Sequence, residues 1–430
     1  MIPYAAWPKI SVCALKNILN RALHLCGAPE RGILRAVVGK AVQIGTRVVL
    51  LFVKPCFHSH RERIRGVYAA AIERGWHVQQ IDAEPTLAHL RNDMKMWNPI
   101  GCLIDPSVMT RHMDPRALKL LPSVLMGRGE AKLDWKRFDC SAQDTRSPVS
   151  AAISELGRLG LRHFAFMGDS ARPYWSVERG LFFRKGLPRD ATFSEYAGPN
   201  PSMVRGRMAA AKWLRSLPLP CGCLLAADHM AAPFYAAAAE AGLAIGTDLP
   251  TVGVDDDERI CLSLAPPLSS VQLDVFMNGV NAVRLLERRL SDPSLPPQKV
   301  AYGAIGVTRR VSTTPIYPDR RVTKGMAFVT AHGCESIAVN DVAREMGCCR
   351  RLAETLFRRH ADCTILDAIR RVRMERTYAL LRNNSVAIDS IPYQCGYAAS
   401  PAYLKTYFKR TTGMTMREWR DAVSPLRRGC

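Results

Sequence analysis

Two segments near the C-terminus carry basic and hydroxyl side chains on one face of a helical pattern, and such side chains bind nucleic acid. Lysine and arginine neutralise phosphates, and an arginine can donate two hydrogen bonds to the edge of a guanine. The candidate DNA-binding residues are Arg350, Arg351, Glu354, Thr355 and Arg358 in the first segment, and Ser400, Lys405, Thr406, Lys409 and Arg410 in the second. We expect Arg358, Lys409 and Arg410 to meet phosphates and most of the others to meet base edges.

A second set of side chains, within the first 300 residues, could bind a small ligand, and the family resemblance given below implies that this ligand is a sugar. Sugar hydroxyls donate to carboxylates and accept from the fork of an arginine, and an aromatic ring packs against the C–H face. Asp228 and Asp255 each follow an apolar strand, at the strand end where open α/β sheets bind ligands. Arg179 and Trp175 lie near the start of one helical pattern, and Asp144 is expected to approach from an opposing lobe. We predict these five residues to bind the ligand.

Simpler roles exist for the same residues. Asp228 would serve equally as a helix cap, and Asp255 as part of a solvated acidic turn with the residues at 256–258. Arg179 would suit a helix surface, and Trp175 would suit a hydrophobic core. The structure has to decide between these alternatives.

The sequence offers little for catalysis or metal binding. It has no Gly-rich phosphate loop, no HExxH and no nucleophile elbow, and no catalytic motif includes His58 or His60. The 14 cysteines are scattered, and the close pairs Cys221/Cys223 and Cys348/Cys349 lack zinc-site spacing. We therefore assign no catalytic residue, cofactor or metal, and free thiols at this density favour a reducing cytoplasm.

Each basic segment follows a shorter helix that ends at a glycine, which is the pattern of a helix-turn-helix. The shorter helices are Ile337–Gly347 and Ile388–Gly396, and Ser400 and Pro401 open the second basic helix. A continuous helical pattern over Leu366–Leu381 joins the two units. Two helices at a steep angle with a basic outer helix form the geometry that enters a major groove. The alternative is a small helical bundle, but the basic residues fall selectively on the outer faces.

The region Ile337–Trp419 resembles the AraC/XylS family of DNA-binding domains. That resemblance implies two helix-turn-helix units that enter successive major grooves, roughly one helical turn (~34 Å) apart. Three features depart from the family: one extra residue between Gly396 and Tyr403, Pro392 inside a helix, and Met416 where a proline is usual.

From Arg47 to about Gln298, short apolar runs alternate with helical stretches. Val48–Phe52, Arg162–Gly168 and Thr251–Val254 are examples of predicted buried strands, and Ala231–Ala241 is a predicted helix. Such alternation predicts layered α/β lobes with parallel sheets. Two lobes with a cleft between them suit a hinged sensor of a small ligand.

This region resembles the effector domain of the lactose-repressor family, which shares its fold with periplasmic sugar-binding proteins. The resemblance is carried by Leu224–Ala231, Ala241–Asp256 and Leu268–Val271. It implies that Trp175, Arg179 and Asp144 fall among the ligand contacts, but Ala227 stands where relatives often have asparagine. A sensor domain of this type followed by an AraC-type DNA-binding domain resembles the xylose operon regulators of bacteria, a family of transcription activators.

The predicted fold class is an α/β two-lobed periplasmic-binding-protein-like sensor followed by an all-α domain with two helix-turn-helix units. We predict a disordered basic extension at 1–46, a sensor at 47–298, a linker at 299–323, the DNA-binding domain at 324–422 and a tail at 423–430. Within the sensor, lobe 1 is expected at 47–147 with 268–298, and lobe 2 at 148–267. An interfacial or targeting helix within Ile10–Cys26 is an alternative for the extension.

Charge and length agree with this organisation. The chain has 430 residues and a net charge of +22, and 18 Lys and Arg stand against 10 Asp and Glu from Lys324 to Cys430. A basic excess also suits RNA or anionic membranes, so charge alone is weak evidence. No apolar run is long enough to span a membrane.

The sequence therefore predicts a cytoplasmic homodimer that binds double-stranded operator DNA and a sugar effector. The resemblance to the xylose operon regulators implies that this effector is xylose or a related pentose. As an activator the protein would also contact RNA polymerase. The alternative is a sugar-binding protein whose basic helical tail binds nucleic acid non-specifically or binds another protein.

Overall fold

The computed structural model describes residues 47–109, 114–129, 134–315, 317–382 and 386–423. The extension predicted at 1–46 and nearly all of the predicted tail lie outside these ranges. The chain forms two compact units, and within the described residues the first comprises 47–54, 67–140 and 280–298. The second comprises 55–66, 141–279 and 299–423. No helix within the described ranges is both long enough and apolar enough to cross a membrane.

The first sheet has the strand order β11-β5-β4-β3-β1-β2. Its strands are β1 (Arg47–Phe52), β2 (Trp76–Ile81), β3 (Gly101–Ile104), β4 (Ser123–Leu125), β5 (Asp139–Gln143) and β11 (Lys299–Tyr302). The associated helices are α3 (His58–Glu73), α4 (Leu87–Trp97) and α10 (Val275–Ser291). Valine, leucine and phenylalanine fill β1, and five of its six residues are buried, as expected for a strand that pairs in parallel on both sides.

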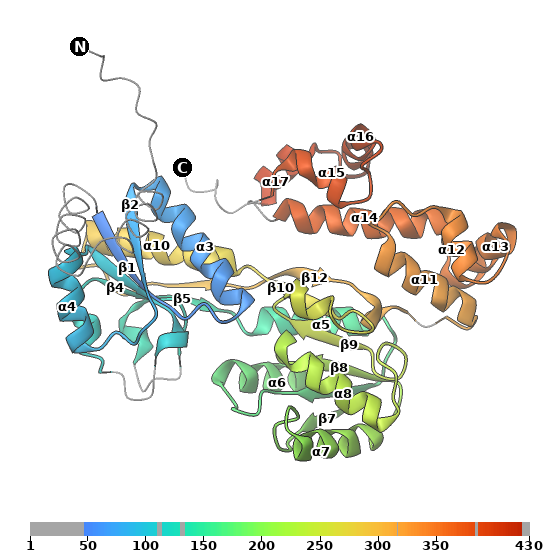
Figure 1. Ribbon diagram of the computed structural model, residues 1–430, viewed down its shortest axis with the longest axis horizontal. Coiled ribbons are helices and arrows are strands. Elements are labelled where there is room, and N and C mark those ends of the chain that lie inside the picture. The colour runs from blue at the N-terminus through green and yellow to red at the C-terminus, as the bar shows by residue number, and fades with distance from the viewer. Residues whose placement is uncertain (1–46, 110–113, 130–133, 316, 383–385, 424–430) are drawn as a thin grey trace, which may run out of the picture. The chain divides into compact units, whose positions relative to one another are not determined.

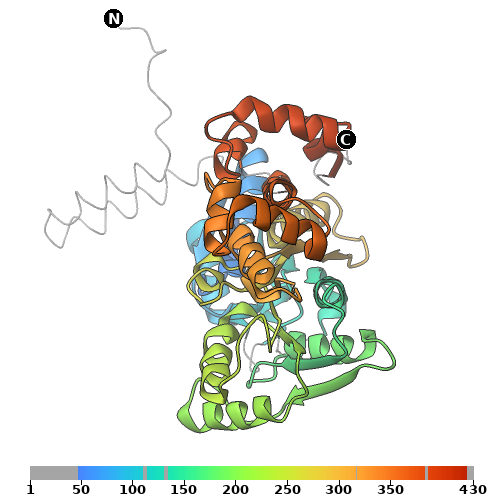
Figure 2. The same cartoon turned by 90° about the vertical axis from the view of Figure 1, so that its right-hand side faces the viewer.

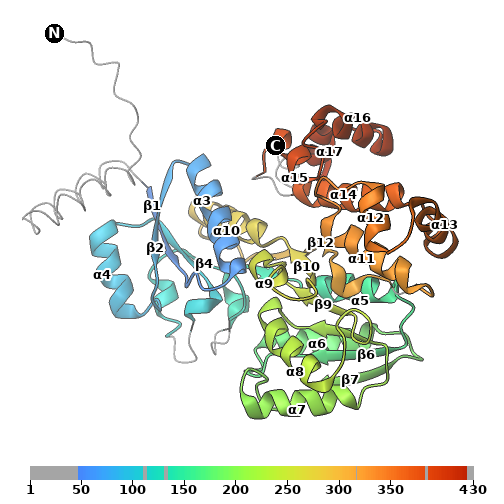
Figure 3. The ribbon, with the colours of Figure 1, turned by 45° about the vertical axis from the view of Figure 1, so that its right-hand side comes forward.

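The second sheet has the order β12-β10-β9-β8-β6-β7, and only β12 pairs antiparallel. Its strands are β6 (His163–Met167), β7 (Thr192–Tyr196), β8 (Cys221–Leu225), β9 (Thr251–Val254), β10 (Ser269–Leu273) and β12 (Ala304–Thr308). Its helices are α5 (Arg146–Gly157), α6 (Tyr174–Gly186), α7 (Val204–Arg215), α8 (Ala231–Ala241) and α9 (Glu258–Cys261) (Figure 3). We call this sheet with its helices the C-terminal lobe; strands β6, β8 and β9 and helix α8 fill its apolar core.

Two segments differ from the sequence-based boundaries. The stretch 268–279, expected in lobe 1, begins with β10, which pairs with β9 in the second sheet. The stretch 299–323, expected as a linker, contains strands β11 and β12, so each of the two sheets gains an edge strand from it.

In the described residues 320–382 and 386–423, the helical domain has seven α-helices. They are α11 (Arg320–His332), α12 (Val339–Glu345), α13 (Arg350–Ala361), α14 (Ile365–Arg382), α15 (Ile391–Gln394), α16 (Pro401–Thr412) and α17 (Met416–Val423). Helix α14 joins two separate apolar cores, with α11–α13 at one end and α15–α17 at the other (Figures 1 and 2). Short 3-10 helices occur at Pro106–Val108, Ala117–Lys119, Trp135–Arg137, Asp228–Met230, Val311–Thr313 and Ile388–Ser390.

The predicted fold class is thus confirmed, since an α/β region with two largely parallel sheets precedes an all-α domain with two helix-turn-helix units. Both turn glycines have the left-handed conformation expected of them, with φ of 68° at Gly347 and 75° at Gly396.

Candidate ligand site and DNA-binding helices

The buried guanidinium of Arg179, on α6, lies at the centre of the candidate ligand site. Arg179 is 3% exposed. One terminal nitrogen donates to the carbonyl oxygen of Ala226, and the other donates to Oε1 of Gln143 at 3.0 Å. Its Nε is buried and has no hydrogen-bond partner among the described residues. Because buried donors are normally paired, this N–H is suited to an acceptor atom of a ligand.

Asp255 follows β9 directly and contributes a negative charge near Arg179. Burial raises the pKa of Asp255, and the charges of Arg179 and His229 oppose that rise. Its backbone has a φ of 115°, which a residue with a side chain rarely adopts. Within the described part of the chain no residue donates a hydrogen bond to its carboxylate, whereas its amide donates to the carbonyl of Val271 at 2.9 Å. The carboxylate is therefore available as an acceptor for a hydroxyl.

Aromatic rings lie beside this pair of charges. The Arg179 guanidinium lies over the ring of Trp175, 5.0 Å from its centroid. Trp175 also meets His229 edge to face at 6.4 Å, and His229 meets Phe57 at 5.5 Å. Trp175 packs partly against the core of the C-terminal lobe, so the core role and the ring-platform role are both compatible with its position. Phe57 is 50% exposed and offers an apolar face that the lobe itself does not cover.

Asp228 has a different environment from the one that a helix cap would have. It is 1% exposed, and it accepts hydrogen bonds from the Ser270 hydroxyl at 2.7 Å and from the Asp257 amide at 2.8 Å. It makes no capping hydrogen bond to the following helices. Burial and the nearby charge of Asp255 raise the pKa of Asp228 well above its usual range. Asp228 thus ties the end of β8 to β10 and to the loop after β9.

The environment of Asp228 predicts a pH-dependent effect of Asp228→Asn. An acid whose pKa is raised by folding lowers the stability as the pH rises from about 4 through the folded-state pKa, because the charged form is disfavoured in the fold. Asparagine keeps an acceptor for the Asp257 amide and does not titrate. We expect the melting temperature of Asp228→Asn to match the wild type near pH 4 and to exceed it near pH 8.

A comparison with Asp228→Ala completes this test. Alanine leaves the Asp257 amide and the Ser270 hydroxyl without their acceptor, at a cost of about 1–3 kcal/mol for each buried group. Its melting temperature should therefore be lower at both pH values. An asparagine variant that is destabilised equally at pH 4 and pH 8 would contradict the role assigned to the Asp228 charge.

The structure does not bring Asp144 into this group by any described contact. Asp144 is exposed, and its carboxylate accepts from the Arg146 amide at 3.0 Å, where α5 begins. The preceding residue, Gln143, is the one that bonds Arg179. Sequence reasoning missed Gln143 and His229, although His229 directly follows Asp228. It also missed the hydrogen bond from Arg63 to the Tyr302 hydroxyl at 3.4 Å, near the same charges.

Helix α13 presents the first set of predicted DNA contacts. Its buried face consists of Ala353, Leu356 and Phe357. Leu352, on the same helix, is 38% exposed. Arg350, Arg351, Thr355 and Arg358 are exposed, Glu354 is half-buried, and the Thr355 hydroxyl donates to the Arg351 carbonyl at 2.9 Å. Among the described residues the three arginines form no ion pair, so their charges are available to a polyanion.

Helix α16 presents the second set. Leu404 and Phe408 are buried, and Ser400, Lys405, Thr406, Lys409 and Arg410 are exposed. Lys405 forms an ion pair with Asp389 at 2.8 Å, and the Arg410 guanidinium lies over the Tyr407 ring at 5.4 Å. Ser400 occupies the cap position without a capping hydrogen bond. Pro392 causes no kink, because α15 begins at Ile391 and the proline lies in its first turn.

Two arginines fix the helix-turn-helix units on α14. Arg373 donates to the carbonyls of Gly333 at 2.7 Å and Glu335 at 2.8 Å, before α12 begins. Arg420, on α17, donates to the carbonyls of Leu381 at 3.0 Å and Val386 at 2.7 Å. The spacing between α13 and α16 therefore depends on α14 and its bonded ends.

Comparisons with known proteins match both parts of the chain. A model of the periplasmic binding protein-like domain matches residues 153–313, and a model of a helix-turn-helix domain matches residues 342–422. The xylose operon regulatory protein of Escherichia coli K12 is 28% identical over 294 residues, which is 66% of this chain and 74% of that protein. The protein of the same name from Haemophilus influenzae is 27% identical over 320 residues, which is 71% of this chain and 82% of that protein.

A solved structure resembles most of the chain in fold. The structure described as the xylose-binding transcription activator xylR superposes with a TM-score of 0.54 and 22% identity, and the match covers 88% of this chain and 99% of that one. This likeness supports the fold. The chain is therefore a DNA-binding regulatory protein, homologous to the xylose operon regulatory proteins, in which a periplasmic binding protein-like domain precedes a helix-turn-helix domain of the AraC type.

Proposed function

We propose that the chain is a transcription activator that responds to xylose or a related sugar. One observation carries the sugar site: a buried Arg179 with an unpaired N–H, next to an Asp255 carboxylate that receives no hydrogen bond among the described residues. The names of the homologous regulatory proteins support xylose as the effector. The cytoplasm is the compartment in which such a regulator meets its DNA.

The chemistry of the site suits a polyhydroxyl ligand. A ring or hydroxyl oxygen would accept from Nε of Arg179, and a hydroxyl would donate to Asp255. The rings of Trp175 and Phe57 would pack against C–H faces. A ligand bound here would shift the protein between states only through a difference in its affinity for them.

On the DNA side, α13 and α16 would enter successive major grooves, and a homodimer would double this set of contacts. The ten predicted residues on these helices, Arg350 to Arg358 and Ser400 to Arg410, are the candidate contacts. As an activator, the bound protein would also meet RNA polymerase. We propose domain limits near residues 47, 310 and 320, since β12 ends at Thr308 and α11 begins at Arg320.

Calorimetric titration of the full-length protein with xylose, arabinose, ribose and glucose tests the sensor. We expect xylose or another pentose to bind with the highest affinity. Absence of heat with every sugar would contradict the proposed effector class. A footprinting experiment on operator DNA tests the DNA-binding domain, because a basic tail that binds non-specifically would give no protected region with a defined boundary.

Arg351→Ala should reduce specific DNA affinity by about 1–3 kcal/mol if Arg351 reads a guanine. Arg358→Ala, expected to remove a phosphate contact, should weaken binding to specific and random DNA alike and reduce the salt dependence. Fluorescence anisotropy with both DNAs distinguishes the two. Equal losses on both DNAs for Arg351→Ala would reassign it to the backbone.

A further inference from the structure

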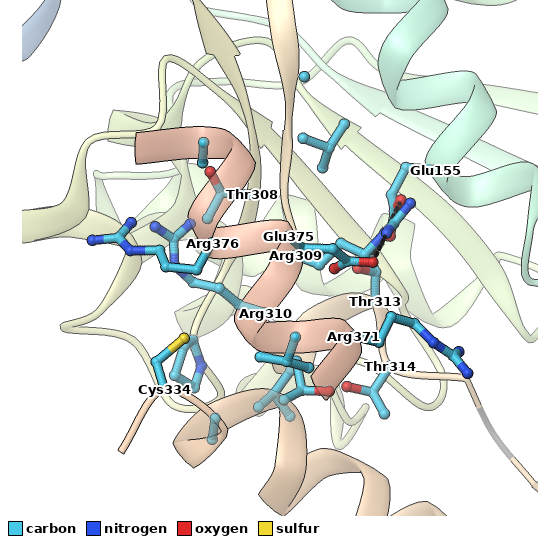
Figure 4. A pocket seen from close by; sticks show the side chains of 18 of the residues that line it. Glu155, Thr308, Arg309, Arg310, Thr313, Thr314, Cys334, Arg371, Glu375 and Arg376 are labelled. Atoms are coloured by element: carbon cyan, nitrogen blue, oxygen red, sulfur yellow. Dashed lines mark hydrogen bonds and ion pairs between the residues drawn. The ribbon is translucent and has the colours of Figure 1, made fainter. Parts of the chain in front are cut away.

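Five side chains form ion pairs that hold α14 against the C-terminal lobe; we call them the α14 network. Arg309, just after β12, pairs with Glu155 of α5 at 2.8 Å and with Glu375 of α14 at 2.5 Å. Figure 4 shows Arg309 between these two glutamates. Arg376, the next residue on α14, pairs with Glu258 of α9 at 3.1 Å. Two neighbouring residues of α14 thus bind two different elements of the lobe.

The surroundings of the network contain many charged side chains. The lobe core and the two helical cores share no buried residue within the described part of the chain. Where α14 faces the lobe there is a pocket of about 610 Å³ whose lining includes Arg158, Arg309, Arg310, Arg371, Arg376 and Arg382 beside three glutamates. Apolar side chains such as Val307 and Val372 also line this pocket, so the ion pairs act together with apolar contacts in holding α14 on the lobe.

The pairs differ in strength, and the weaker ones lie on α14. Glu155 has a side-chain exposure of only 1% and also pairs with Arg158 at 2.7 Å. Burial alone would raise the pKa of Glu155, but Arg158 and Arg309 hold it below its usual value. Removing Arg309 from Glu155 would therefore be costly. Glu375 and Glu258 have side-chain exposures of 36% and 54%, so their pairs break more easily.

The α14 network connects directly to the candidate ligand site through one short segment, residues 255–258, which we call the acidic loop. Asp255 lies beside Arg179, and Asp256 pairs with Arg310 at 2.8 Å and accepts from the Thr308 hydroxyl at 2.6 Å. The loop ends at Glu258, the partner of Arg376.

The loop is also strained, since Asp255 and Asp256 have φ of 115° and 53°. Successive strained residues persist only when their surroundings hold them, and such segments are suited to changing conformation. A hydroxyl that binds Asp255 would act on a loop whose next residues hold Arg310 and α14.

We propose that the acidic loop transmits occupancy of the sugar site to the DNA-binding domain by changing the pairs that Glu258 and Arg309 make with α14. This inference rests on the sugar-responsive function proposed above, and it assigns positioning roles to Glu258, Arg309, Glu375 and Arg376. Ligand binding displaces the loop, the pairs on α14 change, and the helix that sets the spacing of α13 and α16 changes its position on the lobe.

The test measures the coupling ratio, which is the DNA dissociation constant without xylose divided by that with xylose. The full-length protein is titrated onto a DNA fragment that the wild type has selected from random sequences. Glu258→Arg and Arg376→Glu should each change the ratio by about 2- to 30-fold, as is typical of residues within a coupling network. The double variant restores the pair in reverse and should return the ratio towards the wild-type value.

Glu345→Arg is the matched control. Glu345 pairs with Lys324 at 3.1 Å between α12 and α11, within the helical domain. Glu345→Arg changes the net charge of the protein as much as Glu258→Arg does, but it should leave the coupling ratio unchanged. Single variants that keep the wild-type ratio while xylose still binds would overturn the proposed coupling and leave the sugar function intact. If the wild type has a coupling ratio of one and calorimetry detects no heat of xylose binding, both the coupling and the sugar-responsive function are overturned.

Discussion

Arg179→Ala is expected to abolish measurable sugar binding. A buried arginine that donates to a ligand contributes through charge-assisted hydrogen bonds, and its truncation also removes the positive charge that favours the charged form of Asp255. A loss of about 2–5 kcal/mol is typical of such a change and corresponds to affinity roughly 30- to 5,000-fold weaker. Calorimetry with xylose measures it directly.

Two further variants make this result interpretable. Arg184→Ala removes an exposed arginine from the same helix, α6, whose guanidinium lies over the Phe193 ring, and it should bind xylose like the wild type. Asp255→Asn should weaken binding by about 10- to 150-fold through the lost charged acceptor. It should not unfold the lobe, because no described residue bonds to that carboxylate. Wild-type affinity in both Arg179→Ala and Asp255→Asn would place the sugar elsewhere.

Gly396→Ala should remove the second helix-turn-helix from the folded domain. At φ of 75° a side chain costs about 1–2 kcal/mol. A Cβ would also lie 2.8 Å from the carbonyl oxygen of Cys334 and 2.9 Å from that of Glu335, and backbone atoms at that distance must move. We expect a lower melting temperature of the helical domain and at least about 100-fold weaker specific DNA binding, since half of the groove contacts depend on α16.

Gly347→Ala separates the two contributions. Gly347 is the turn residue of the first unit and has nearly the same φ, 68°, but a Cβ there would have no atom within 4 Å. It should therefore show the conformational cost alone and a smaller loss of DNA affinity. If the two alanine variants behave alike, the contact of Gly396 with the turn before α12 does not matter for the fold.

The sequence was most informative where local signals and burial agree. Helix α8 and strand β9 have the predicted bounds, since an alanine-rich helix ends at Gly242 and a continuous apolar strand follows. The strands that the sequence did not reveal, such as β5, β11 and β12, are short, and they lie at sheet edges or carry polar residues. Strand β5 begins with Asp139, which is buried only because Arg288 and Arg289 pair with it. No local pattern reveals such a distant pairing.

The residues of the candidate site were also predictable only in part from the sequence. Arg179 and Asp255 were predictable from residue type and from their place after strands or near a helix start. The role of Asp228 was not, because its partners Ser270 and Asp257 come from other elements of the sheet. On α13 the buried position of one turn is filled by the small Ala353 and not by the larger Leu352, which the residue types alone do not indicate.

Strands β11 and β12 are one continuous segment interrupted only by Gly303, and each is hydrogen-bonded into a different sheet. A protein engineer who wished to graft this receptor onto another output module would have to keep that segment. A junction at residue 298 would strip an edge from both sheets, whereas a junction after Arg310 would preserve the receptor and also the residue that binds Asp256.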